Sequence, residues 1–386
     1  MNRCLEIRFV AALLVVLCPW FSNSAQACKL GKVGEVVRPS ALRAQVLAPR
    51  SSDENGLLNV VEANACPKPD CDTPTCETFQ EDSPFVRLAG YAQVPVDTLH
   101  YTCFAVSKLS DRYYVALASE DGTFHRSLSR DGLIWNPQGA VSGLDRPGYK
   151  GFRCPDPHFV GDEGEMELFY SSNDSLSGWG ISYATSDDYG ASWTAYGTVF
   201  QLDEPGYYAY MPSVVRYQGE YRMVYAKVCK GSATALADLY LARSTDGIHW
   251  TPLSDEPALS TSECGAWDDG SVNRPRMVVD PDGSTLHIFY SGFGWVGGTV
   301  STRCSKIGHA ASHDGGRSWC RTELPVLDRP AAGETWDDNF YAVPSFTWER
   351  DQTALRIYYL GVGLDREAFS GIGAAEAEWP LPDPCD

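Results

Sequence analysis

The chain has 386 residues, of which 44% are hydrophobic and 12% aromatic, so it can bury a sizeable core in one large β domain or two ordinary domains. Lys and Arg total 31 against 50 Asp and Glu, which gives a net charge of −19. This charge repels phosphate backbones, argues against a nucleic-acid partner, and fits neutral or cationic ligands.

The N-terminus has the pattern of a targeting segment. Arg3 and Arg8 make a positively charged start. An apolar run of 13 residues follows from Phe9 to Phe21, which is too short to span a bilayer comfortably. Ala25-Gln26-Ala27 then matches a cleavage site. We therefore predict a signal peptide at residues 1–27, rather than a buried first helix, and a secreted, periplasmic or cell-surface protein with no membrane span.

The cysteines agree with export. Cleavage after Ala27 leaves 11 of the 13 cysteines, with Cys28 first in the mature chain. A lipid on Cys28 would leave 10, which can all pair as disulfides, but Ala-Gln-Ala-Cys lacks the Leu usual in lipidated bacterial proteins. A secreted protein with one spare thiol is therefore favoured, and a lipid anchor at Cys28 stays the alternative.

Residues 28–84 differ from the sequence that follows. They are rich in Pro, Ser, Asp and Asn, and they contain Cys66, Cys71 and Cys76. Zinc sites favour tighter cysteine pairs together with His, so a disulfide-tied loop is the better interpretation. We predict a linker or cap in this region.

From residue 85 the chain repeats one strand-rich unit. A β-branched and aromatic run containing Tyr recurs five times, at Tyr114, Tyr170, Tyr225, Tyr290 and Tyr359. Each of the first four runs is followed by a Ser-x-Asp-Gly-like turn and a Trp, at Trp135, Trp193, Trp250 and Trp319. Asp in such a turn accepts backbone N–H bonds, and Gly allows positive φ. A strand that opens with Pro comes before the Tyr run, at Pro157, Pro212, Pro275 and Pro344.

These elements give four strands per unit, repeated about every 60 residues. We therefore predict that residues 85–386 form an all-β, five-bladed propeller with four-stranded blades. A β-sandwich does not require similar units in one order. The last unit lacks its fourth strand, so a segment before residue 100 is expected to close the ring.

The Pro-strand and Tyr-strand at Pro212 to Tyr225, with the Ser-x-Asp-Gly-x-x-Trp turn, resemble the five-bladed propellers of the arabinanase, levansucrase and invertase superfamily (glycoside hydrolase families 32, 43, 62 and 68). The resemblance covers roughly residues 90–380 and implies a site in the axial funnel. It implies three carboxylates there, one from each of blades 1 to 3, because one carboxyl must donate a proton while another stays ionised.

Blade 2 matches this pattern through Asp156, which precedes Pro157 and has Arg153 nearby to keep it ionised. In blade 1, counting 13 residues back from Tyr114 gives Tyr101, which is preceded by His100. The nearest carboxylate there is Asp97. Blade 3 has no Glu at the matching place, so the general acid is missing.

Other acids recur from blade to blade and are discounted as structural, including Glu204, Asp145, Asp203, Asp255 and Asp328. Blades 4 and 5 carry Trp-Asp-Asp motifs, from which Asp269 and Asp338 are candidates to bind sugar hydroxyls. Asn273 and Arg274 are expected to take the place of Asp156 in blade 4 and to point into the funnel, as is His100.

The sequence thus predicts an exported carbohydrate-active protein, with glycoside hydrolysis by Asp156 and Asp97 as the leading activity. The alternatives are a propeller that binds sugar without catalysis and a surface interaction propeller. Arg153, His100, Asn273, Arg274, Asp269 and Asp338 are the predicted substrate-binding residues. No cofactor is expected, although the resemblance leaves an axial calcium ion open.

Overall fold

The computed structural model describes residues 83–88, 103–120, 122–175, 178–230, 236–296, 299–300, 305–330, 337, 341–362 and 370–386. The predicted signal peptide, Cys28 and the cysteine run from Cys66 to Cys76 lie outside these residues, as do Asp97, His100 and Asp338. The described residues form strands and turns without a helix, and hence no helix among them could cross a membrane.

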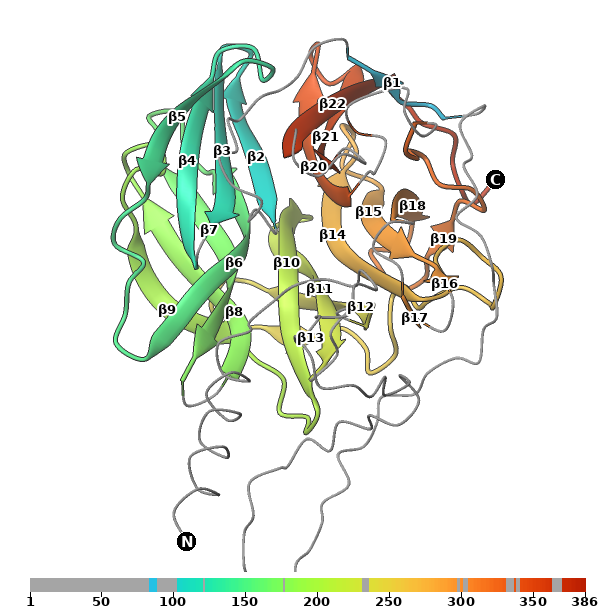
Figure 1. Ribbon diagram of the computed structural model, residues 1–386, viewed down its shortest axis with the longest axis horizontal. Coiled ribbons are helices and arrows are strands. Elements are labelled where there is room, and N and C mark those ends of the chain that lie inside the picture. The colour runs from blue at the N-terminus through green and yellow to red at the C-terminus, as the bar shows by residue number, and fades with distance from the viewer. Residues whose placement is uncertain are drawn as a thin grey trace, which may run out of the picture. The chain divides into compact units, whose positions relative to one another are not determined.

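The described strands form five antiparallel four-stranded blades, as predicted, which follow one another in chain order around a centre (Figure 1). Blade 1 contains β2 (Phe104–Ser110), β3 (Tyr113–Glu120), β4 (Thr123–Ser129) and β5 (Trp135–Ala140). Blade 2 contains β6 (Tyr149–Phe159), β7 (Met166–Asp174), β8 (Gly178–Ser186) and β9 (Thr194–Phe200). Blade 3 contains β10 (Tyr207–Tyr217), β11 (Glu220–Cys229), β12 (Ala237–Ser244) and β13 (Thr251–Pro252).

Blade 4 contains β14 (Ser271–Val279), β15 (Leu286–Phe293), β18 (Lys306–Ser312) and β19 (Cys320–Arg321). A separate hairpin of β16 (Trp295–Val296) and β17 (Thr299–Val300), which the repeat did not predict, interrupts this blade. Blade 5 contains β20 (Tyr341–Glu349), β21 (Ala354–Val362) and β22 (Ser370–Glu378). Its fourth strand is β1 (Val86–Arg87), which pairs with β22. A segment from before residue 100 therefore closes the ring, as predicted.

The hydrophobic core is divided into clusters that lie between neighbouring blades. Between blades 2 and 3, for example, the ring of Phe169 meets Tyr221 and Trp250 edge to face, with centroids 6.1 and 5.8 Å apart. Such aromatic pairs add about 0.5–1.5 kcal/mol beyond the area they bury. The recurring Tyr and Trp residues thus hold the blades side by side.

The Ser-x-Asp-Gly turns have the predicted chemistry. In each of four turns the Ser hydroxyl donates to the Asp carboxylate at 2.8 to 3.0 Å. The same carboxylate accepts two backbone N–H groups, for example those of Arg317 and Ser318 on Asp314. Burial alone would raise the pKa of Asp314, but these bonds outweigh it and lower that pKa to about 2. Trp193, Trp250 and Trp319 donate their indole N–H to the Gly of their own turn.

A bulge in the innermost strands decides which side chains reach the axis. Cys154, Met211 and Arg274 have φ of 50°, 55° and 47°, and each comes directly before a Pro. The pairing with the second strand shifts at these places in β6, β10 and β14. A bulge can accommodate Pro, because the strand pairing is interrupted there and the missing N–H of Pro breaks no hydrogen bond of the ladder. The three bulges therefore align Pro155, Pro212 and Pro275.

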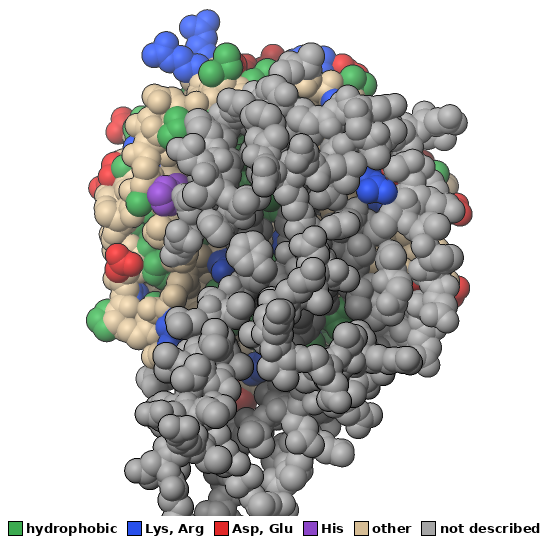
Figure 2. Space-filling model, in the orientation of Figure 1, with side chains coloured by type: hydrophobic (Ala, Val, Ile, Leu, Met, Phe, Trp, Pro, Cys, Tyr) green, Lys and Arg blue, Asp and Glu red, His purple; other side chains and the backbone are tan. Residues whose placement is uncertain are grey.

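Two disulfides lie among the described residues and agree with the predicted cysteine pairing. Cys103 bonds Cys154, which joins the innermost strands of blades 1 and 2, and Cys320 bonds Cys385, which ties the C-terminal segment to blade 4. Cys229 and Cys264 are also disulfide-bonded. On the face of the molecule in Figure 2, the visible charged side chains of the described residues are scattered rather than gathered into one patch.

Candidate functional site

The register identifies the residue of each blade that matches Asp156. The Asp156 carboxylate accepts the Val214 N–H at 2.6 Å. In the same way Ser213 accepts the Met277 N–H at 3.0 Å, and Ser345 accepts the Val106 N–H at 2.8 Å. By the same register Arg276 takes this position in blade 4 and Ala105 takes it in blade 1.

This register corrects two expectations. Asn273 and Arg274 do not take the place of Asp156, because they precede the Pro and match Arg153 and Cys154. In blade 1 the residue that matches Asp156 is Ala105, and not His100 as the count had given. The count failed because Tyr114 pairs with Lys108 near the start of β3, whereas Tyr170 lies opposite the bulge of β6.

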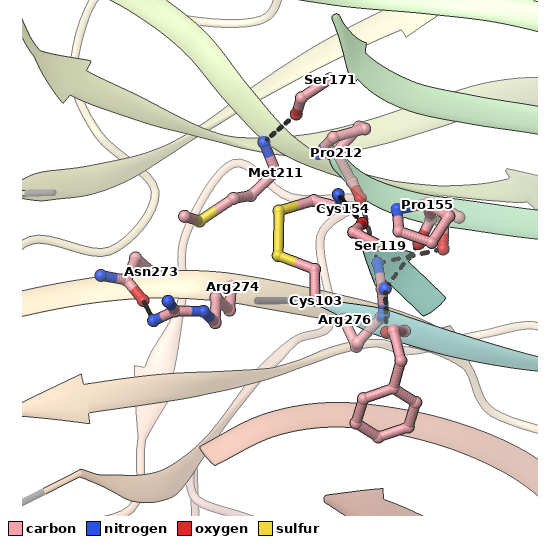
Figure 3. The surroundings of a disulfide bond; sticks show 12 residues. Cys103, Ser119, Cys154, Pro155, Ser171, Met211, Pro212, Asn273, Arg274 and Arg276 are labelled. Carbon is pink, nitrogen blue, oxygen red and sulfur yellow. Dashed lines mark hydrogen bonds and ion pairs between the residues drawn. A yellow bond between two sulfur atoms is a disulfide. The ribbon is translucent and has the colours of Figure 1, made fainter. Parts of the chain in front are cut away.

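The centre of the propeller is filled by the Arg276 guanidinium. Its Nη1 donates to Asp156 Oδ1 at 3.2 Å and to the Pro212 carbonyl at 3.1 Å. Its Nη2 donates to the carbonyls of Phe104 at 3.1 Å and Pro155 at 2.8 Å. One side chain of blade 4 thereby binds the innermost strands of blades 1, 2 and 3 (Figure 3).

Asp156 is buried and fully engaged. Besides Arg276 and the Val214 N–H, its carboxylate contacts His158 Nε2 at 2.8 Å. Burial lowers the pKa of His158, but the charge and hydrogen bond of Asp156 outweigh that effect, so this pKa stands above its usual value. Asp156 is the only carboxylate that the described part of the innermost strands brings to the ring of matching positions.

Aromatic rings gather on the side of the Asp156–Arg276 ion pair where the innermost strands begin, which is called the N-terminal side below. Tyr210 of β10 meets Trp179 of β8 edge to face at a centroid distance of 4.9 Å, and Tyr208 at 5.7 Å. Burial raises the pKa of Tyr208, and the charge of Arg153, on the neighbouring strand β6, opposes the rise. Tyr208 and Trp179 are partly exposed. This group, Arg153, Trp179, Tyr208 and Tyr210, is called the aromatic cluster below.

Asn273 and Arg274 lie on the same side of the ion pair. Arg274 Nη1 donates to Asn273 Oδ1 at 3.2 Å, and its guanidinium lies 5.8 Å from the centre of the Phe293 ring. Arg274, Met211 and the Cys103–Cys154 disulfide surround one small space (Figure 3). The described residues that line this space thus offer sulfur atoms and a guanidinium, and no carboxylate.

The Trp-Asp-Asp motifs stabilise the blades. Asp268 accepts the Tyr290 hydroxyl at 2.9 Å and Arg321 at 3.0 Å. Asp337 accepts the Tyr359 hydroxyl at 2.8 Å, and Arg87 of β1 at 3.2 Å. The predicted sugar ligand Asp269 is also buried, and it accepts the backbone N–H groups of Trp295 and Gly265, both at 2.9 Å.

The described residues at the axis do not fit a calcium ion. Calcium takes six to eight oxygen ligands, several of them carboxylates. The axis instead holds the guanidinium of Arg276, which occupies the carbonyls of Phe104, Pro155 and Pro212 and the carboxylate of Asp156. A cation beside this guanidinium would be repelled.

Sequence reasoning missed Arg276 and His158. Each directly follows a Pro that was predicted to open a strand, Pro275 before Arg276 and Pro157 before His158. Alignment on Pro155, Pro212 and Pro275 would have matched Arg276 with Asp156. The signal that misled was the Tyr spacing, which also depends on the length of the hairpin between the first two strands.

No protein-family model matches the sequence, and no curated protein matches it. Solved structures do match. An N-acetylgalactosamine deacetylase from F. plautii, solved with blood group B trisaccharide, is 17% identical with a TM-score of 0.57 and covers 77% of this chain and 96% of its own.

Two glycoside hydrolase structures match in the same way. One comes from work on family 130, which contains mannoside phosphorylases and hydrolases of β-1,2-mannosidic linkages in Candida mannan; it is 16% identical, has a TM-score of 0.55, and covers 81% of this chain and 99% of its own. The other is a thermostable family 43 glycoside hydrolase. It is 15% identical with a TM-score of 0.53, and the match covers 74% of this chain and 98% of its own. The chain therefore has the five-bladed propeller fold of glycoside hydrolase families 43 and 130.

Proposed function

We propose that this protein is an exported carbohydrate-active propeller that binds an oligo- or polysaccharide on the N-terminal side of its axis. The observation that carries the proposal is the aromatic cluster of Arg153, Trp179, Tyr208 and Tyr210. Aromatic faces pack on sugar rings, and a guanidinium donates hydrogen bonds to hydroxyl groups. The deacetylase that shares the fold was solved with a trisaccharide, which supports a carbohydrate ligand.

Export is part of the same proposal. Disulfides persist in oxidising compartments, and Cys103–Cys154 and Cys320–Cys385 are therefore compatible with an extracellular or periplasmic protein. The signal peptide at residues 1–27 and the lipid at Cys28 stay predictions, and the mass of the mature N-terminal peptide tests both.

Glycoside hydrolysis is the second candidate, because hydrolases are among the proteins that share the fold. The reaction needs two carboxyl groups about 5–10 Å apart, one protonated and one ionised. Asp156 would be one of them, with Asp97 as the other and His100 and Asp338 as further contacts. The engagement of Asp156 by Arg276, His158 and Val214 favours binding over hydrolysis.

A substitution in the aromatic cluster tests glycan binding. Trp179→Ala removes the partly exposed ring beside Tyr210, and we expect at least about tenfold weaker binding to the best ligand of a glycan array. Tyr196→Ala is the matched control, because Tyr196 is 53% exposed on β9 and contacts only Tyr183 among the aromatic side chains of the described residues. Equal loss in both variants, or no glycan bound by the wild type, would contradict the proposal.

A second experiment separates binding from hydrolysis. Wild type and Asp156→Asn are screened on aryl-glycosides and oligosaccharides, and urea unfolding is measured alongside because Asp156 also pairs with Arg276. Glycan binding without turnover supports the first candidate. Turnover that a folded Asp156→Asn variant loses supports the second, whereas turnover that persists removes Asp156 from the reaction.

A further inference from the structure

A second cavity lies on the C-terminal side of the Asp156–Arg276 ion pair. Its volume is about 370 Å³, and residues of all five innermost strands line it. This volume is in the usual range of small-molecule sites. Neither the aromatic cluster nor Asn273 and Arg274 are among its lining residues. Part of the lining is apolar, including Val215, Met277 and Trp348.

The charged lining of this cavity is mainly basic. Lys108, His158, Arg216 and Arg276 come from blades 1, 2, 3 and 4, whereas Asp156 is the one acidic residue of the lining. Asp156 is already bound by Arg276 and His158. In a chain of net charge −19, this is a local excess of cations. A low-dielectric hollow with such a lining favours an anion.

Arg216 is the cation most open to a ligand. Lys108 is taken up by Glu349 at 2.8 Å and Asp111 at 2.6 Å. Arg216 instead lies over the ring of Tyr221 with its side chain 58% exposed. Its Nη2 donates to the Tyr221 hydroxyl, and the nearest carboxylate among the described residues, that of Glu167, is 3.9 Å away. That carboxylate already accepts hydroxyls from Tyr183 and Tyr221, so Arg216 keeps donors for a further anion.

His158 supplies a second donor. Its Nε2 is held by Asp156 at 2.8 Å, while its Nδ1 makes no hydrogen bond to the described residues. The side chain is 35% exposed, and it lines the same cavity as Arg216. Burial lowers the pKa of His158, but the charge and hydrogen bond of Asp156 outweigh it and raise that pKa, which favours the protonated ring. In the protonated imidazole Nε2–H donates to Asp156, and Nδ1–H is a second donor whose direction the first bond fixes.

We propose that this cavity binds a small organic carboxylate of monosaccharide size, whose carboxylate group contacts Arg216 and His158. The guanidinium can hold a carboxylate through two parallel hydrogen bonds. The rest of the molecule lies against Trp348, Met277 and Val215. This site is separate from the glycan site proposed above, because the ion pair of Arg276 with Asp156 closes the axis between them.

Calorimetric titration with D-glucuronate and D-glucose tests the proposal, since the two sugars have the same ring and differ in the carboxylate. We expect the wild type to bind D-glucuronate and not D-glucose. Arg216→Gln and His158→Gln should each raise the dissociation constant for D-glucuronate by about tenfold or more. Arg317→Gln is the matched control, because Arg317 is exposed on the turn of blade 4, outside the cavity.

Three results would overturn this inference. The wild type could fail to bind D-glucuronate, it could bind both sugars equally, or Arg216→Gln could leave the dissociation constant for D-glucuronate unchanged. Trp179→Ala separates this site from the glycan site, because it should leave D-glucuronate binding intact while it weakens glycan binding. Loss of D-glucuronate binding in Trp179→Ala would place the anion in the aromatic cluster and refute the second site.

Discussion

Arg276 shows how one residue can determine what an axial site does. A buried guanidinium costs free energy unless its donors find acceptors, and here three carbonyls and one carboxylate accept from Nη1 and Nη2, while the buried Nε has no hydrogen-bond partner among the described residues. The same bonds hold the Asp156 side chain in place. A carboxylate that stabilises the centre of the ring in this way is poorly suited to exchange protons with a substrate.

The ion pair can be tested by removing its cation. Arg276→Met leaves the buried Asp156 carboxylate without its guanidinium, and we expect a loss of about 3–5 kcal/mol in the free energy of urea unfolding. The double variant Arg276→Met, Asp156→Leu should lose less than Arg276→Met alone, because it leaves no buried charge unpaired. Arg317→Met, on the surface, should change stability by less than about 0.5 kcal/mol. If the double variant lost as much free energy of unfolding as Arg276→Met and Asp156→Leu lose separately, added together, the two residues would not interact.

Recurrence in the sequence was a sound guide to which residues are structural. Asp328, discounted because its motif recurs, is buried against Lys306 at 2.7 Å. The first Asp of each Trp-Asp-Asp motif, Asp268 and Asp337, is likewise tied to a Tyr and an Arg. The partners of Arg276 could not be predicted from the sequence, because they lie on three other blades and only the closed ring brings them together.

At the scale of the element, blade 4 contains an unusual histidine pair. His287 of β15 and His309 of β18 are buried and stacked, with Nδ1 of one and Nε2 of the other 3.0 Å apart. Phe289 and Trp379 cover the pair. Burial lowers the pKa of His287 to about 4 and that of His309 to about 3. Neither ring can take up a proton without leaving a charge in this apolar layer.

The pair makes the stability of the protein depend on pH. Unfolded histidines take up protons near pH 6.5, whereas the folded pair stays neutral until about pH 4, so the unfolded state binds more protons between these values. The free energy of unfolding should therefore fall as the pH drops from about 6.5 to 4, by roughly 1.4 kcal/mol per pH unit for each histidine.

Urea unfolding between pH 7 and pH 4 measures this slope. Replacing both histidines, as His287→Leu with His309→Leu, should make the slope clearly shallower even if the variant is less stable at pH 7. Arg317→Gln is the control, because Arg317 is exposed on the turn of blade 4 and its replacement removes no histidine, so the slope should stay nearly unchanged. An unchanged slope in the double variant would exclude the pair as the source.

The elements were predictable to the extent that their pattern is local. Tyr runs and Ser-x-Asp-Gly turns are short-range signals, and they gave the right number of blades. The alignment between blades was less secure, because the loop between the first and second strands differs in length. It comprises residues 218–219 in blade 3 and residues 160–165 in blade 2. That variation shifts the Tyr relative to the bulge between blades 2 and 3. The error in blade 1 has another cause, because Tyr114 lies near the start of β3 and Ala118 takes the position that Tyr170 has in blade 2.

At the scale of the whole molecule, two covalent links restrain the ring. Cys103–Cys154 and Cys320–Cys385 close loops of 51 and 65 residues. By loop-closure entropy, removal of either with paired Cys→Ser substitutions should cost about 4 kcal/mol. Urea unfolding of the two double variants should give similar losses, because the loops are similar in length. A much larger loss for Cys103→Ser with Cys154→Ser would mean that the axial disulfide also acts through packing at the centre.

The ring is closed by a very short strand, and side chains of its segment, among them Arg87 and the buried Phe85, add contacts to the neighbouring strands. β1 contains only Val86 and Arg87. Arg87 donates to Asp337 at 3.2 Å and to the Asp328 carbonyl, and it lies 5.6 Å from the centre of the Tyr359 ring. Arg321 of β19 makes the same contacts in blade 4, with Asp268, the Ser260 carbonyl and Tyr290.

Arg87→Ala should therefore open the closure between β1 and β22. It removes the guanidinium that pairs with the buried carboxylate of Asp337, and we expect a loss of about 2–3 kcal/mol in the free energy of urea unfolding. Hydrogen exchange should rise along β22 and the neighbouring edge of β21, because their outer partner is lost. Arg350→Ala provides the contrast, since Arg350 pairs with Glu376 and Glu378 at the surface and should cost less than about 1 kcal/mol. If both variants were equally stable, the ring would not depend on Arg87 for its closure.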